Sequence, residues 1–209
     1  MVPVVGRIRV GHMTESLLME TCGVDVIDEH ESMTSSGGNP VDKYGKTPHI
    51  AAVKNLETAL DAICKGASML RTECPKDENK PKTLKDTSEM IKTIFKDIKV
   101  YSDMTPEALK TKLDTLTPSK ASLIRQCVRH KRLPVPLFAD GGVVLPLDAA
   151  LMMHFGADGV VASAQVFKAK NPENRIRAMV MAVTHFNDPY KLSRYSEGNG
   201  IAGPELKYE

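Results

Sequence analysis

The chain contains no tryptophan, and aromatic residues make up only 5% of its 209 residues. A surface of aromatic side chains that stacks on nucleic-acid bases is therefore not expected. The formal net charge is only +2, which removes the bulk electrostatic attraction that nucleic acids and anionic membranes require. We accordingly expect neither a nucleic acid nor a membrane as a partner.

Long apolar runs and paired cysteines are also missing. No apolar stretch approaches membrane-spanning length, and the N-terminus lacks the charged and apolar regions of a secretion signal. The cysteines form no C-x-x-C pair, and the histidines show no ligand spacing to one another or to a cysteine. We expect free thiols, no bound metal, and a soluble protein of the cytoplasm.

The most informative stretch of the chain runs from residue 133 to residue 167. An apolar run, Val135–Ala139, reaches the pair Gly141-Gly142, and an apolar-periodic helix follows over Ala149–Phe155. A second apolar run, Gly159–Phe167, begins soon after Gly156. Connections this short predict a strand–helix–strand unit with parallel strands. The Gly pair then lies at the carboxyl end of its strand, where such folds bind ligands.

The rest of the chain continues the alternation of strands and helices. Further strands are predicted over Val2–Val10, Val24–Asp28, His49–Val53 and Ser68–Arg71. Helices are predicted over Thr14–Thr21, Leu56–Lys65, Thr87–Val100 and Asn171–Val183, with two more starting near Pro106 and Pro118. We expect exposed segments over Ser32–Lys46 and Glu73–Lys85, and a turn-rich tail over 187–209. The pattern predicts one α/β domain over 1–209 with six βα units, where a TIM barrel has eight.

Several motifs resemble one enzyme family. The segments VPVVGRIRVGH (2–12), VDVIDEHE (24–31), LPVPLFADGG (133–142) and LDAALMMHFGADGV (147–160) are similar, in order, to the synthase subunit of glutamine-dependent pyridoxal 5'-phosphate synthase, the PdxS/SNZ family. The resemblance implies a TIM (β/α)8-type barrel that combines ribose 5-phosphate, glyceraldehyde 3-phosphate and ammonia. It also implies that this chain starts at the third strand, so that the barrel is incomplete and its first two units are missing.

The resemblance implies two lysines that form Schiff bases with the sugar. At the first position, within GRIRVGH, this chain has Arg7; at the second, after Arg71-Thr72, it has Glu73. A guanidinium stays protonated and a carboxylate is no amine, so neither residue forms an imine. We expect Arg7 to hold a carboxylate or phosphate. Lys54, at the end of its strand, is the one lysine expected near the barrel mouth.

The resemblance also implies two phosphate sites. The first is a glycine-rich loop after Glu73, but no glycine occurs between Gly66 and Gly141. The second joins a Gly pair to a Gly-Ser-Gly segment, which here reads Ser163-Ala164-Gln165. Gly141 and Gly142 therefore remain as weak phosphate candidates and are better explained by a tight turn.

Two further residues match the family. Asp28 matches an active-site carboxylate, and we expect it to form an ion pair with Arg7 or Arg9. His12 matches a family histidine, for which we expect a role at a helix start or in packing.

Three functions are compatible with these residues. The first is a non-catalytic paralogue that joins active synthase subunits in a hetero-oligomer or homo-oligomer. The second is an active pyridoxal 5'-phosphate synthase subunit, and the third is a non-catalytic sugar-phosphate binder. The family is a lyase-type enzyme of vitamin B6 synthesis whose product is pyridoxal 5'-phosphate, so no cofactor is expected. The family's glutaminase partner is not favoured, because its docking surface draws on the missing N-terminal part.

Overall fold

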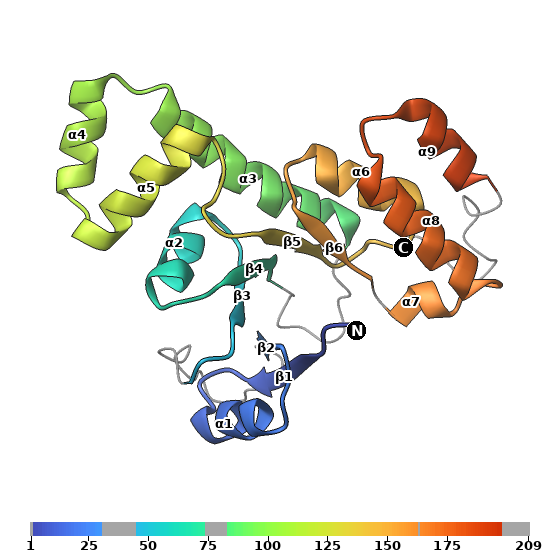
Figure 1. Ribbon diagram of the computed structural model, residues 1–209. Coiled ribbons are helices and arrows are strands. Elements are labelled where there is room, and N and C mark those ends of the chain that lie inside the picture. Colours follow the sequence, from blue (N-terminus) through green and yellow to red (C-terminus); the bar gives the residue numbers. More distant parts are fainter. Residues whose placement is uncertain (1, 31–44, 74–82, 163, 198–209) are drawn as a thin grey trace.

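Six parallel strands form one curved sheet, with the strands adjacent in chain order (Figure 1). The computed structural model describes residues 2–30, 45–73, 83–162 and 164–197. The strands are β1 (Val5–Arg9), β2 (Val26–His30), β3 (His49–Val53), β4 (Met69–Thr72), β5 (Leu137–Asp140) and β6 (Gly159–Val161). The register sets Arg7 opposite Asp28 and Ala52 opposite Arg71. The predicted α/β fold, an incomplete TIM-type barrel, is confirmed.

Helices lie along the outer side of this curved sheet (Figure 1). Their bounds are α1 (Met13–Thr21), α2 (Leu56–Cys64), α3 (Leu84–Ser102), α4 (Pro106–Asp114), α5 (Pro118–His130), α6 (Pro146–His154), α7 (Ala164–Phe167), α8 (Pro172–Thr184) and α9 (Pro189–Ser196). The predicted starts of α4 and α5 at Pro106 and Pro118 are confirmed. Proline suits the first helical position because the N–H it lacks has no partner there.

The apolar core lies between the sheet and these helices. Val53, Leu70 and Leu137 of the strands are fully buried, as are Ile91 and Ile94 of α3. Strand residues alternate between the two faces of a sheet, so the residues next to these core residues project inward. In β1 the alternation buries Ile8 against the helices, which leaves Arg7 and Arg9 on the inner face.

The structure corrects two predictions near the C-terminus. The predicted strand Gly159–Phe167 is wrong beyond Val161, because Ala164–Phe167 form a helix. Short apolar runs do not distinguish strand from helix by periodicity. The tail predicted to be turn-rich contains α9, which packs against α6 and α8. Asp188 at the N-cap and Pro189 after it mark the start of this helix, and that signal was missed.

Other differences concern boundaries. Helix α3 begins at Leu84, three residues before the predicted start, because Thr83 and Asp86 form a capping box. Some predictions fall at least partly outside the described residues: the segments Ser32–Lys46, Glu73–Lys85 and 187–209, and the position of Ser163. Within the described ranges, none of the helices has the length and hydropathy that crossing a membrane demands.

Candidate functional site

Four charged side chains meet on the inner face of the sheet and form what we term the inner ion cluster: Arg7, Asp28, Arg71 and Asp140. The Arg7 Nε donates to Asp28 Oδ2 at 3.2 Å, and the Arg71 Nε donates to Asp28 Oδ1 at 2.8 Å. Both carboxylate oxygens of Asp28 are thus bound by guanidinium groups, one from β1 and one from β4.

Arg71 is the centre of the inner ion cluster. Its side chain is only 3% exposed, and its Nη1 lies 3.4 Å from Asp140 Oδ2. The Arg71 Nη2 also donates to the backbone carbonyl of Glu29 at 3.1 Å. A buried charge is tolerated when it is both paired and hydrogen-bonded, and Arg71 meets both conditions.

Hydroxyl groups fix the end of β5 and so position Asp140. The Thr72 hydroxyl donates to the Asp140 carbonyl at 2.8 Å and accepts from the Asp140 N–H at 2.9 Å. The Thr87 hydroxyl, on α3, donates to the carbonyl of Gly141 at 2.8 Å. The carboxyl end of β5 is therefore tied to β4 and to α3.

The predicted pairing of Asp28 with Arg7 is confirmed, but the alternative with Arg9 is wrong. The Arg9 Nε donates to Glu15 Oε1 at 2.7 Å, and the Arg9 backbone N–H donates to Glu15 Oε2 at 2.9 Å. The expected helix-start role of His12 is confirmed, since its Nδ1 accepts from the Glu15 N–H at the N-cap of α1.

The Gly141-Gly142 turn runs close to the start of α3. Gly142 has a φ of +71°, and a Cβ there would lie 2.1 Å from the backbone nitrogen of Leu84. Both the positive φ and the lack of space demand glycine. This close approach by itself accounts for glycine at position 142, as the tight-turn interpretation requires.

Carboxylates already occupy the helix starts beside the Gly pair. Asp148 Oδ2 accepts from the backbone N–H groups of Val144 and Leu145, at 3.2 and 2.8 Å. At the start of α3, Asp86 Oδ2 accepts from the Thr83 N–H at 3.0 Å. Free N–H groups at helix starts are what attract phosphate. Here a bound phosphate would compete with these carboxylates and face Asp140.

His30, at the end of β2, belongs to the same electrostatic environment. Partial burial lowers the pKa of His30, and the positive charges of Arg7 and Arg71 lower it further. Burial and the two arginines therefore disfavour the protonated form of His30, while the carboxylates of Asp28 and Asp140 act in the opposite direction on its pKa. Sequence analysis did not single it out, although its spacing of two residues from Asp28 places both on the same face of β2.

The strands in the described part of the chain offer no lysine to this face of the sheet. None of the six strands in the described part of the chain contains a lysine. Lys54 is exposed in the turn after β3, where its N–H donates to the Thr58 hydroxyl. Glu73 follows β4, and its N–H donates to the Val53 carbonyl. Across the described ranges, no three His, Cys, Asp or Glu side chains cluster as metal ligands.

Comparison of the sequence with known proteins identifies related families. The model of the SOR/SNZ family matches residues 1–140, and that of thiazole biosynthesis protein ThiG matches residues 117–199. The PdxS subunit of pyridoxal 5'-phosphate synthase from Dictyoglomus turgidum is 38% identical over 207 residues, covering 98% of this chain and 69% of the relative.

Two further relatives have similar coverage. The PdxS subunit from Thermus thermophilus is 37% identical over 201 residues, covering 95% of this chain and 67% of the relative. A probable pyridoxal 5'-phosphate synthase subunit from Dictyostelium discoideum is 37% identical over 203 residues, covering 96% and 65%. The chain thus spans about two thirds of the length of these relatives. It belongs to the SOR/SNZ family, and so to a family of pyridoxal 5'-phosphate biosynthesis.

Proposed function

We propose that this chain is a non-catalytic member of the family that acts as a partner of active synthase subunits. The observation that carries the proposal is the residue at position 7, where the family resemblance implies a Schiff-base lysine. The residue there is an arginine whose guanidinium is bound to Asp28, and no strand of the described sheet supplies a lysine in its place.

The inner ion cluster supports this proposal chemically. Schiff-base formation requires an amine that loses its proton, and a guanidinium remains protonated in proteins. Acid–base catalysis requires a carboxylate that reaches the substrate. Both oxygens of Asp28 instead accept from Arg7 and Arg71, so this carboxylate serves a structural ion network.

The proposed partner role is supported by the edges of the described sheet and by the relatives, which are subunits of pyridoxal 5'-phosphate synthase. In the described sheet, β1 pairs only with β2, and β6 pairs only with β5. Unpaired edges of a parallel sheet favour association with further chains. An active synthase subunit is the partner that we propose.

Covalent trapping tests the non-catalytic part. The purified chain is mixed with ribose 5-phosphate, reduced with borohydride and measured by intact mass, beside a family member that has lysine at the position of Arg7. We expect an adduct on that family member and none on this chain. An adduct on this chain that disappears in the variant Lys54→Arg would establish an active enzyme with a displaced lysine.

Co-expression tests the partner part separately. A tagged active family subunit is purified from cells that also make this chain, and native mass spectrometry counts both chains in each oligomer. We expect mixed oligomers whose composition persists through gel filtration. Oligomers that contain the tagged subunit alone would contradict the partner role and leave the trapping result unaffected.

A second candidate function is the binding of an anionic sugar without turnover. It rests on the half-exposed Arg7 side chain, which is bound to Asp28 through Nε while 50% of its surface stays accessible. Ribose 5-phosphate would then raise the melting temperature of the protein, and Arg7→Gln would abolish the shift. No shift at millimolar ribose 5-phosphate would reject this candidate.

A further inference from the structure

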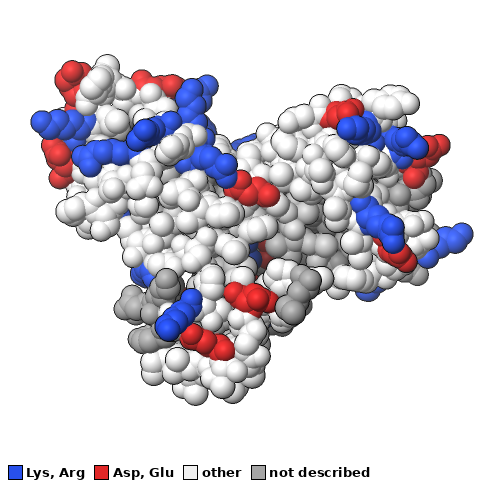
Figure 2. Space-filling model, viewed as in Figure 1, with Lys and Arg blue, Asp and Glu red and all other residues white. Residues whose placement is uncertain are grey.

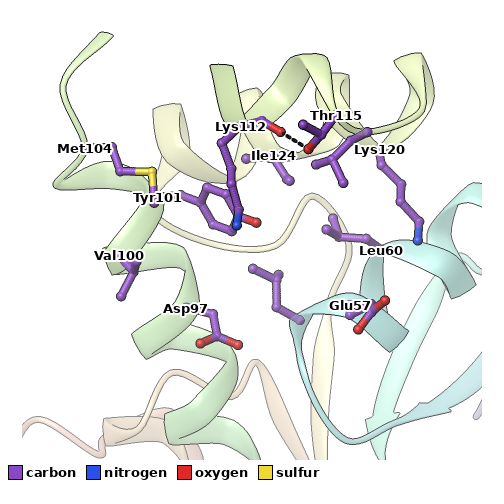
Figure 3. Close-up of a pocket in the computed structure, with 12 residues that line it drawn as sticks. Glu57, Leu60, Asp97, Val100, Tyr101, Met104, Lys112, Thr115, Lys120 and Ile124 are labelled. Atoms are coloured by element: carbon purple, nitrogen blue, oxygen red, sulfur yellow. Dashed lines mark hydrogen bonds between the residues drawn. The ribbon is translucent and has the colours of Figure 1, made fainter. Parts of the chain in front are cut away.

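A cavity of about 450 Å³ lies between α2, α3, α4 and α5, outside the barrel (Figure 3). None of its lining residues belongs to the inner ion cluster. Cavities of this volume are typical of small-molecule sites, which combine an apolar floor with a few polar groups.

Core side chains form the floor of this cavity. Leu56 and Leu60 of α2 and Ile124 of α5 line it, and each is buried in the core. Leu116 adds a partly buried apolar side chain from the segment between α4 and α5. The floor is therefore a largely buried apolar surface, which suits contact with a hydrocarbon group of a ligand.

Side chains of opposite charge, Asp97 and Lys112, also line this cavity. Asp97 and Tyr101 are four residues apart, so they share one face of α3. Figure 3 shows the Lys112 ammonium and the Tyr101 hydroxyl directed into the cavity, with the Asp97 carboxylate one turn away. The cavity thus presents an acceptor for a cation and, about one helical turn away, two donors for an anion.

These charged groups are available to a ligand. The nearby Lys120 is bound to Asp61 at 2.6 Å. By contrast, within the described ranges neither Asp97 nor Lys112 takes part in an ion pair with another side chain. Asp97 is partly buried, and its carboxylate can accept hydrogen bonds from an ammonium group of a ligand.

We propose that the cavity binds a free amino acid with an apolar side chain. The ammonium group of the ligand binds Asp97, its carboxylate binds Lys112 and Tyr101, and its side chain lies on Leu60 and Ile124. Lysine and arginine side chains gather over α4 and α5 (Figure 2), which disfavours a ligand that carries only positive charge. The proposal is independent of the proposed function at the inner face.

Titration with L-phenylalanine, followed by amide NMR of the full chain, tests the proposal. We expect saturable shifts confined to signals of α2 to α5, with a dissociation constant of roughly millimolar order for a ligand of this size. Asp97→Asn and Lys112→Gln should each weaken binding by about ten-fold or more. Glu107→Gln, an exposed carboxylate on α4 that does not line the cavity, should leave binding unchanged.

Two matched compounds test the requirement for both charges. 2-Phenylethylamine lacks the carboxylate and 3-phenylpropionate lacks the ammonium group, so both should bind at least about ten-fold more weakly than L-phenylalanine. Equal binding of either compound would overturn the proposed zwitterion site. If L-phenylalanine at about 20 mM, roughly twenty times the expected dissociation constant, gives no saturable shifts, the proposal as a whole is overturned.

Discussion

The two arginines of the inner ion cluster differ in what surrounds them, and this difference predicts their energetic roles. Arg71 is buried between Asp28 and Asp140, whereas half of the Arg7 side chain is exposed. Removing one partner of a buried ion network leaves a charge without compensation, while an exposed pair contributes little.

We therefore predict that Arg71→Gln lowers the free energy of unfolding by about 3 kcal/mol. Arg7→Gln, the matched control, should lower it by no more than about 1 kcal/mol. Urea denaturation of both variants measures the difference. Equal losses would mean that the buried position of Arg71 has no energetic consequence.

His30 predicts a pH dependence of stability. In the folded chain, the pKa of His30 lies below its ordinary value of 6.5. Burial is the largest cause, and the positive charges of Arg7 and Arg71 are the next. The unfolded chain therefore binds more protons at pH values between the folded pKa and about 6.5, so stability falls as the pH is lowered through this interval.

His30→Gln should remove this contribution and flatten the fall in stability below about pH 6.5. Urea midpoints measured between about pH 7.5 and 5 for both proteins test it. Identical slopes in the two proteins would contradict the lowered pKa.

The cysteines predict a pattern of thiol reactivity. Burial raises the pKa of Cys127 to about 11, while Cys22 and Cys64 are exposed. Because the thiolate is the reactive form, iodoacetamide at about pH 8 should modify Cys22 and Cys64 and spare Cys127 in the folded protein. Peptide mass spectrometry, with a urea-unfolded sample as the control, gives the modified fraction at each position.

At the scale of elements, the Gly141-Gly142 turn connects β5 to α6 and contacts the start of α3. Ala at position 142 would combine an unfavourable positive φ with overlap against Leu84. We predict that Gly142→Ala lowers the free energy of unfolding by more than about 2 kcal/mol.

Gly23 provides the matched control for this prediction. It has a similar φ of +77°, but a Cβ there meets nothing within 4 Å. Gly23→Ala should therefore cost only the backbone term of about 1 kcal/mol. Similar losses in the two variants, measured by urea denaturation, would show that the contact with α3 contributes nothing.

At the scale of the whole molecule, apolar side chains collect along the β1 edge of the sheet. Val4 and Val5 are 58% and 51% exposed, and Leu17 and Leu18 of the neighbouring α1 are exposed as well. An exposed apolar edge strand promotes association. A charge placed on this edge should reduce association without disturbing the core.

The double variant Val4→Lys/Val5→Lys should therefore shift the distribution of sedimentation coefficients toward the monomer at equal concentration. Tyr190→Lys, which replaces an exposed side chain on α9, is the control and should leave the distribution unchanged. The prediction fails if both variants sediment like the unmodified chain.

Local patterns were sufficient for much of the fold. The strand His49–Val53 was predicted at its observed bounds, since its apolar residues are bounded by clear turn signals. The helix starts at Pro106 and Pro118 were also predicted, because N-caps act within a few residues. The strand predicted to reach Phe167 failed, since an apolar run of that length is compatible with either conformation.

The sequence by itself determined the parallel α/β fold and the arginine at position 7, and it limited the partner of Asp28 to Arg7 or Arg9. The structure chose Arg7. Only the tertiary structure decided that Arg71, 43 residues along the chain, binds the other oxygen of Asp28. The cavity between α2, α3, α4 and α5 also became visible only in the tertiary structure. Strand and helix signals are local, whereas ion networks and cavities depend on how distant elements pack, and the spacing of residues along the chain does not encode that packing directly.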